Sequence, residues 1–109
     1  MNGTWEALAD PTRRSIVEHL ASGELTAGEV AARFDAARPG ISRHLRVLRE
    51  AGVVEAQERG RQRVYRLAPA ALDELEQWCR DVRTFWGQRL DALDTEIARG
   101  ARARREEQA

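Results

Sequence analysis

The clearest pattern along the chain is an amphipathic stretch between residues 38 and 51. Leu45 and Leu48 lie within about 40° of Ile41 when each residue advances a helix by ~100°. The opposite side of this stretch is polar and rich in arginine, with Pro39, Ser42, Arg43, Arg46, Arg49 and Glu50. The pattern predicts a helix that buries one side in the protein and offers arginines to an anionic surface.

Two shorter helices are predicted before it. Asp10 followed by Pro11 is typical of a helix start, and Gly23 ends this helix. Thr26 and Glu29 have capping-box spacing, so the next helix begins at Thr26. The residues expected to be buried in these two helices are Ile16, Val17, Leu20, Val30, Ala31 and Phe34. Leu25 is expected to be a linker residue and residues 35–37 a turn, while Trp5, Leu8 and Ala9 indicate one or two helical turns at the N-terminus.

A β-hairpin is predicted after the amphipathic helix. Gly52 is expected to cap that helix, and a strand begins at Val53. Residues 64–67 form the returning strand, and residues 59–62 form a basic turn between the two. An arginine-bearing helix followed by a basic hairpin is the order found in a winged helix-turn-helix that reads DNA. The expected fold class is therefore mainly α with a small β-hairpin.

A long last helix is predicted from Pro69, with apolar residues three or four positions apart. These residues are Leu72, Leu75, Cys79, Val82, Trp86, Leu90, Leu93 and Ile97, and a second line repeats every seven residues at Ala71, Trp78, Phe85 and Ala92. Thirty helical residues span ~45 Å, so a small domain cannot cover both lines and a partner chain is expected to do so. We expect one domain over residues 1–99 and a charged, disordered tail over residues 100–109.

Charge is unevenly distributed along the 109 residues, although the formal net charge is zero. Residues 33–66 contain nine arginines and four acidic residues, which leaves +5, and the chain contains no lysine. A local basic surface is what DNA binding requires, whatever the overall charge. The positive charge therefore coincides with the amphipathic helix and the hairpin.

Several functional classes are disfavoured by composition. Cys79 is the only cysteine, which excludes an internal disulfide and fits a reducing cytosol. Neither a membrane span nor a signal peptide is visible, so a cytoplasmic bacterial protein is expected. Nucleophile triads, phosphate loops and metal clusters are also missing from the sequence. We expect neither enzymatic activity nor a cofactor.

From about Trp5 to Ile97 the chain resembles the ArsR/SmtB family of bacterial winged-helix repressors. The segments that carry the resemblance are residues 8–14 with Ile16, residues 41–45, residues 48–54, and Gly60 followed by Val64 and Tyr65. The resemblance implies a homodimer formed through the first and last helices. It also implies repression from a palindromic operator that is released on sensing a signal.

Metal sensing is not expected, because the chain departs from the family at its metal sites. Metal-sensing members carry two cysteines at the positions of Thr26 and Gly28, and a second site uses Asp and His on the last helix, which here has no His. Thiolate or imidazole ligands are needed for tight binding of zinc and similar ions. His19 and His44 lie in different helices, and His19 is interpreted as structural.

The predicted double-stranded DNA contacts are Arg38, Pro39, Gly40, Ser42, Arg43, His44, Arg46, Arg49, Arg61 and Arg63. Arg43 and Arg46 are the candidates for reading guanine in the major groove, because Arg can donate two hydrogen bonds to its O6 and N7 atoms. The arginines at the helix ends suit phosphate contacts, and those of the hairpin suit a minor groove or phosphates.

Some alternatives remain open for individual residues. His44 fits either a DNA contact or a hydrogen bond within the domain, and Gly40 fits either sequence drift or close backbone approach. Arg13 and Arg14 fit either salt bridges with acidic side chains or DNA contacts. The predicted dimer interface is Trp5, Leu8, Leu72, Leu75, Trp78, Cys79, Val82, Phe85, Trp86, Leu90 and Leu93. Aromatic residues of this set could line a ligand pocket, and Cys79 could act in redox sensing.

A rival function is a winged-helix module whose arginines bind an acidic protein. Salt-dependent binding to duplex DNA with a preference for an inverted repeat would exclude it. The sequence identifies neither an operator nor a small-molecule effector.

Overall fold

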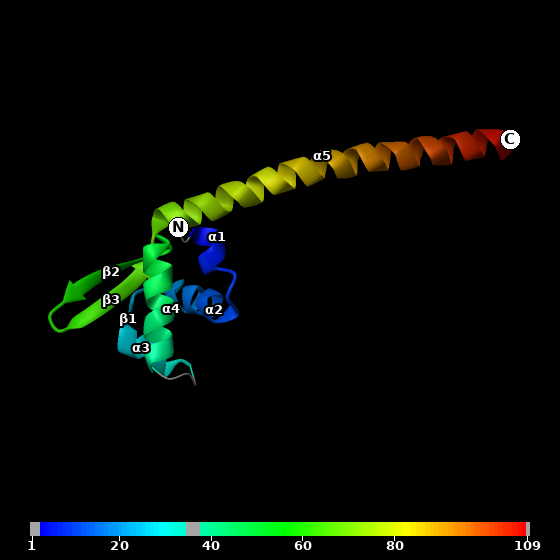
Figure 1. Cartoon of the computed structure of the whole chain (residues 1–109). Helices are drawn as coiled ribbons and strands as arrows, with labels where there is room; N and C mark the ends of the chain where they lie inside the picture. The colour runs from blue at the N-terminus through cyan, green and yellow to red at the C-terminus, as the bar shows by residue number, and fades with distance from the viewer. Residues whose placement is uncertain (1–2, 35–37, 109) are drawn as a thin grey trace. The chain divides into compact units, whose positions relative to one another are not determined.

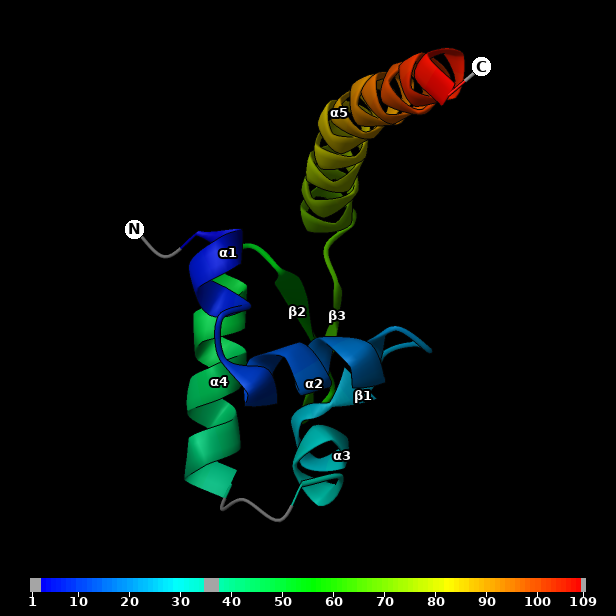
Figure 2. The same cartoon turned by 90° about the vertical axis from the view of Figure 1, so that its right-hand side faces the viewer.

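The computed structural model describes residues 3–34 and 38–108, so the expected turn at residues 35–37 lies outside the described residues. Its elements, in chain order, are α1 (Thr4–Ala7), α2 (Pro11–Leu20), β1 (Leu25–Thr26), α3 (Ala27–Ala32), α4 (Arg38–Glu50), β2 (Val54–Arg59), β3 (Gln62–Leu67) and α5 (Pro69–Gln108). Residues up to Glu74 form one compact unit, and the remainder of α5 forms a second. Figures 1 and 2 show the elements of the first unit from two sides.

Both helix starts predicted from capping residues are confirmed. The Asp10 carboxylate accepts a hydrogen bond from the backbone N–H of Arg13 at 3.0 Å, and Pro11 is the first residue of α2. Thr26 and Glu29 form the reciprocal capping box of α3, with N···O distances of 3.1 and 3.0 Å. These short-range bonds satisfy backbone N–H groups that a helix leaves without intrahelical partners at its start.

Leu25 is a strand residue rather than the predicted linker residue. It pairs with Tyr65 while Thr26 pairs with Val64, so β1 adds a third strand to the hairpin and the sheet order is β1-β3-β2. The partner strand lies 40 residues further along the chain, and a two-residue strand has no periodicity for a sequence pattern to reveal. The expected fold class is confirmed in its helices and hairpin, but the sheet has three strands.

The hairpin turns over two residues at Gly60 and Arg61, inside the predicted turn. Gly60 has a φ of +63°, and glycine at the first turn position fits the type II′ turn that matches the twist of the flanking strands. The strands are in register from Val54 opposite Leu67 to Arg59 opposite Gln62. In Figure 1 this hairpin extends to one side of α4.

The chain leaves α4 through a left-handed residue. Gly52 has a φ of +79°, its N–H donates to the carbonyl of Arg49 at 3.0 Å, and the N–H of Val53 donates to the carbonyl of Leu48 at 2.9 Å. This is the Schellman arrangement, and the two apolar residues that it brings together are both buried. It carries the chain directly from α4 into β2.

The hydrophobic core lies where α2, α3, α4 and the sheet meet. It contains Ala7, Ile16, Leu20, Leu25, Val30, Ile41, Leu45, Leu48, Val53, Val54 and Tyr65. The apolar side of α4 is the most completely enclosed, because Ile41, Leu45 and Leu48 are each at most 1% exposed. α1 lies beside the end of α4 that leads to β2 (Figures 1 and 2).

α5 continues as a helix to Gln108, through the residues for which the sequence predicts a charged, disordered tail. The last ten residues are mostly Ala, Arg and Glu, which are strong helix formers, and arginines near a helix C-terminus interact favourably with its dipole. Among the described residues no helix is both long and apolar enough to cross a membrane.

Gly52→Ala is expected to destabilise the first unit by about 1–2 kcal/mol, because a side chain at positive φ is strained. Gly100→Ala is the matched control, since Gly100 is helical and a Cβ there meets nothing within 4 Å. Urea unfolding measures both free energies. A Gly52→Ala protein as stable as Gly100→Ala would contradict the expectation.

Candidate nucleic-acid interface

Most of the predicted DNA-contacting residues meet in one groove between α4 and the hairpin. The groove has a volume of about 680 Å³ and is lined by Pro39, Gly40, Ser42, Arg43, Arg46, Arg49, Arg63 and Tyr65. Four guanidinium groups face this space, and none of its described lining residues is acidic. The groove is therefore a positively charged surface that an anionic chain can enter.

α4 supplies six of these residues because one of its sides is apolar and buried and the other is polar and exposed. Its apolar side is held in the core, which leaves Ser42, Arg43, Arg46 and Arg49 exposed on the other side. Gly40 contributes open space, since a Cβ built there meets nothing within 4 Å. The backbone of Arg38 begins α4, but its side chain lies outside the described part of the structure.

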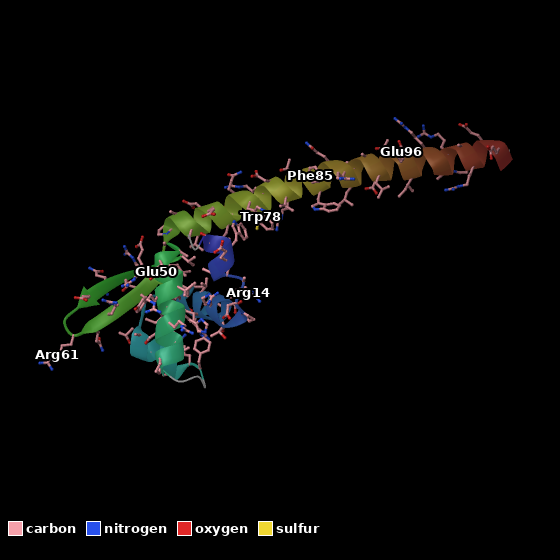
Figure 3. The ribbon with its side chains drawn as sticks, viewed as in Figure 1. Arg14, Glu50, Arg61, Trp78, Phe85 and Glu96 are labelled. Atoms are coloured by element: carbon pink, nitrogen blue, oxygen red, sulfur yellow. The ribbon has the colours of Figure 1, made fainter. Side chains whose placement is uncertain are left out.

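The hairpin contributes Arg63 and Tyr65 from β3 to the groove. The Arg63 side chain donates to the Glu58 carboxylate at 3.2 Å, and this hydrogen bond, with a second to Tyr65, raises the pKa of Arg63. Exposed ion pairs of this kind contribute ~0–1 kcal/mol, so Arg63 can exchange Glu58 for another anion at little cost. Arg61 does not line the groove but lies at the tip of the hairpin (Figure 3).

A further arginine, in the last position of β2 before the turn, ties the hairpin to the rest of the first unit. Arg59 donates to both carboxylate oxygens of Glu24, at 2.7 and 3.3 Å, and Glu24 immediately precedes β1. Arg66 and Glu55 form a cross-strand pair at 2.8 Å. The sequence pattern did not single out Tyr65 as a site residue or Arg59 as an anchor, because both assignments depend on pairing between distant segments.

His44 lies inside the domain rather than in the groove. Its Nδ1 atom is 3.3 Å from Nη1 of Arg13 and 3.9 Å from the Asp10 carboxylate, and its side chain is 22% exposed. Of the two interpretations left open by the sequence, this geometry supplies the internal hydrogen bond. His19 contacts Phe34 edge to face at 5.3 Å, which agrees with a structural role.

Arg13 and Arg14 have partners that neither alternative from the sequence anticipated. Arg13 donates from Nε to the carbonyl of Ala7 at 2.6 Å, and Arg14 donates from Nη1 to the carbonyl of Leu8 at 2.8 Å. Both arginines therefore bind backbone carbonyls at the end of α1, where a helix leaves its carbonyl groups without intrahelical partners.

Most of the predicted dimer-interface residues are exposed on the protein surface. Trp86, Leu90 and Leu93 are 53–55% exposed, and together with Arg89 they border an open apolar surface on α5. Leu8, Leu75 and Val82 are half-buried, whereas Cys79 is exposed. Figure 3 shows Trp78 and Phe85 on this helix. Within the described residues no group of His, Cys, Asp or Glu could hold a metal ion.

Helices α2, α3 and α4 pack on a small sheet, the exposed side of α4 carries arginines, and a hairpin lies beside α4. These features define a winged helix-turn-helix protein. A family model described as a helix-turn-helix domain matches residues 8–57. The HTH-type transcriptional regulator Rv2034 of Mycobacterium tuberculosis is 45% identical over 86 residues, which cover 79% of this chain and 78% of that protein. The transcriptional repressor SdpR of Bacillus subtilis is 37% identical over 78 residues, covering 72% of this chain and 87% of that protein.

The solved structures that resemble this chain also include transcriptional regulators. The crystal structure of the ArsR family transcriptional regulator RHA00566 is similar with a TM-score of 0.72 and 32% identity, covering 79% of this chain and 94% of that chain. A homodimeric winged helix-turn-helix domain of Mb0332 from Mycobacterium bovis matches with a TM-score of 0.62 and 28% identity, covering 74% of this chain and 75% of that chain. The chain belongs to the ArsR family of winged helix-turn-helix transcriptional regulators.

Acidification is expected to weaken the fold through Asp10. The hydrogen bond from the backbone N–H of Arg13 lowers the pKa of Asp10, so its stabilising effect is present above the unfolded pKa of ~3.9 and is lost as pH falls through the lower folded value. Asp10→Asn keeps a capping oxygen but does not titrate. Between pH 7 and pH 3 the original protein should lose more unfolding free energy than Asp10→Asn in urea titrations, and equal losses would contradict this.

Proposed function

We propose that this chain is a homodimeric repressor that binds an inverted-repeat DNA operator through the groove between α4 and the hairpin. The observation that carries the proposal is the convergence of Arg43, Arg46, Arg49 and Arg63 on one surface. A DNA-binding regulator of a bacterial gene acts in the cytoplasm, where the chromosome lies, and we infer that location for this protein. A small-molecule effector is not part of the proposal.

In this proposal α4 enters the major groove of DNA. Arg43 and Arg46 lie on its exposed side and read base edges, with Ser42 beside them, because a guanidinium can form two hydrogen bonds to guanine. Arg38 and Arg49 stand at the two ends of α4 and bind phosphates, which position the protein without reading sequence. Pro39 and Gly40 occupy the first turn of α4, and the absence of a side chain at Gly40 allows the DNA backbone to come close.

The hairpin extends the contact to a neighbouring part of the duplex. Arg61 at the tip can enter a minor groove, where a narrow groove concentrates negative potential, while Arg63 stays near α4. His44 is held by Arg13 in the free protein, so we assign it an internal role and not a DNA contact.

Homodimerisation is supported by the apolar surface of α5 and by the homodimeric Mb0332 domain. The side chains of Phe85, Trp86, Leu90, Leu93 and Ile97 are all more than half exposed along one helix. Burying a side chain of this size contributes roughly 1.5–3 kcal/mol, which makes a second copy of the helix a favourable cover. The proposed interface also includes α1 and the N-terminal part of α5. Its further residues are Trp5, Leu8, Leu72, Leu75, Trp78, Cys79 and Val82.

A dimer of this kind determines the form of the operator. Two copies related by a two-fold axis place two α4 helices in successive major grooves, so the half-sites form an inverted repeat about 10–10.5 base pairs apart. The name of the relative SdpR supports repression as the outcome of binding. A change in the pairing of the α5 helices would alter the spacing of the two α4 helices and hence the DNA affinity.

Arg43→Ala combined with Arg46→Ala should abolish selective binding to the operator. Each lost bidentate contact costs about 1–3 kcal/mol of specific binding free energy. The operator is first selected from a random duplex library, and fluorescence anisotropy then compares it with a scrambled duplex. The matched control, Arg80→Ala with Arg83→Ala, removes two arginines from α5 and should keep the discrimination. Unchanged discrimination in the Arg43/Arg46 variant would refute this reading of α4.

Leu90→Glu should convert the dimer to a monomer, because the carboxylate would have to be buried without a partner in the apolar interface. Thr84→Glu is the control, since residue 84 lies about 160° around the helix from Trp86. Sedimentation equilibrium measures the mass of each variant. A Leu90→Glu protein that remains dimeric at the concentrations of the original chain would place the dimer interface elsewhere.

A further inference from the structure

Arg13 is bonded to two helices besides its own. Its Nε donates to the carbonyl of Ala7 at 2.6 Å and its Nη2 to the carbonyl of Glu6 at 3.4 Å, both in α1. Its Nη1 lies 3.3 Å from Nδ1 of His44 in α4. One guanidinium in α2 thus connects the C-terminal end of α1 to the middle of the helix whose other side lines the arginine-rich groove.

Arginine has donors and no acceptor, so in this contact Nδ1 of His44 accepts the hydrogen bond from Arg13. The Asp10 carboxylate lies 3.9 Å from the same Nδ1 atom and also caps α2 through the backbone N–H of Arg13. Both the backbone and the side chain of Arg13 belong to the junction between α2 and α4.

The same chain of contacts reaches the start of α5. Thr4, in the first turn of α1, is 5% exposed, and its hydroxyl donates to the Glu74 carboxylate at 3.1 Å. α1 is only four residues long, so it has little intrahelical bonding to hold its end in place. The guanidinium of Arg13 joins this short helix to α4 by hydrogen bonds.

We propose that Arg13 is a positioning residue for DNA recognition: it holds α4 through His44 against α1 and does not itself touch DNA. The inference rests on the proposed DNA-binding role of α4. Each of the three nitrogens of its guanidinium has a partner within the protein, so three of the five N–H donors of Arg13 are already directed at α1 and His44. Base readout by α4 needs a fixed helix, because bidentate contacts tolerate little displacement.

The experiment measures operator affinity and its salt dependence for Arg13→Ala and Arg13→Lys. We expect both to weaken operator binding on the order of tenfold, as the loss of a charge-assisted hydrogen bond would. Lysine keeps the charge but cannot connect three acceptors with one planar group. The slope of log K against log salt should stay unchanged in both variants, because that slope counts phosphate contacts.

Arg14→Ala is the matched control. Arg14 is the next residue and also donates to backbone carbonyls after α1, at Leu8 and Ala9, but these bonds do not run to α4. Its removal takes away the same charge and should leave operator affinity within twofold of the original. Thermal unfolding gives the Tm of every variant. Operator affinity is then measured below the lowest Tm, so that only folded proteins are compared.

A double-mutant cycle with His44→Ala tests whether Arg13 acts through His44. If it does, Arg13→Ala should have a smaller effect on operator affinity in the His44→Ala background than in the original chain. Full rescue by Arg13→Lys, together with a salt slope reduced by about one unit in Arg13→Ala, would instead make Arg13 a phosphate contact and overturn the proposal. Unchanged affinity in both Arg13 variants would overturn it too. Neither result would affect the proposed function, whose own failure would appear as undiminished operator selection in the Arg43/Arg46 variant.

Discussion

The burial of one side of α4 is the interaction on which the rest of this structure depends. Ile41, Leu45 and Leu48 are almost fully enclosed, and each contributes roughly 1.5–3 kcal/mol of hydrophobic stabilisation. The exposed ion pairs of the hairpin contribute ~0–1 kcal/mol each, so they cannot compete in setting the orientation of the helix. The apolar side therefore decides where the arginines point, and the groove follows from it.

A second constraint is the length of α5 relative to the domain that carries it. The helix extends over 40 residues, and six of its large apolar side chains are 51–58% exposed, namely Trp78, Phe85, Trp86, Leu90, Leu93 and Ile97. A surface of this kind is usually a site of association. In the function proposed above, DNA binding and dimerisation therefore occupy different helices, α4 and α5. The hydrogen bond from the hydroxyl of Thr4 to the carboxylate of Glu74 joins α1 to the first turns of α5.

Local signals predicted the helices well, and long-range contacts account for what they missed. The caps at Asp10 and Thr26 and the exit at Gly52 act over a few residues, so the sequence pattern was sufficient for them. β1 has two residues and exists only because β3 pairs with it. α5 extends to Gln108, and the helix propensity of its last residues, mostly Ala, Arg and Glu, favours this extension.

The sequence by itself determined which residues could form the groove, because helical spacing places the arginines of α4 on one side and the hydrophobic residues on the other. It also determined the absence of paired cysteines at Thr26 and Gly28. Only the tertiary structure decided that Arg63 joins the groove, and that His44 bonds to Arg13. These outcomes depend on how elements far apart in the chain pack together, and residue spacing within one element carries no record of that packing.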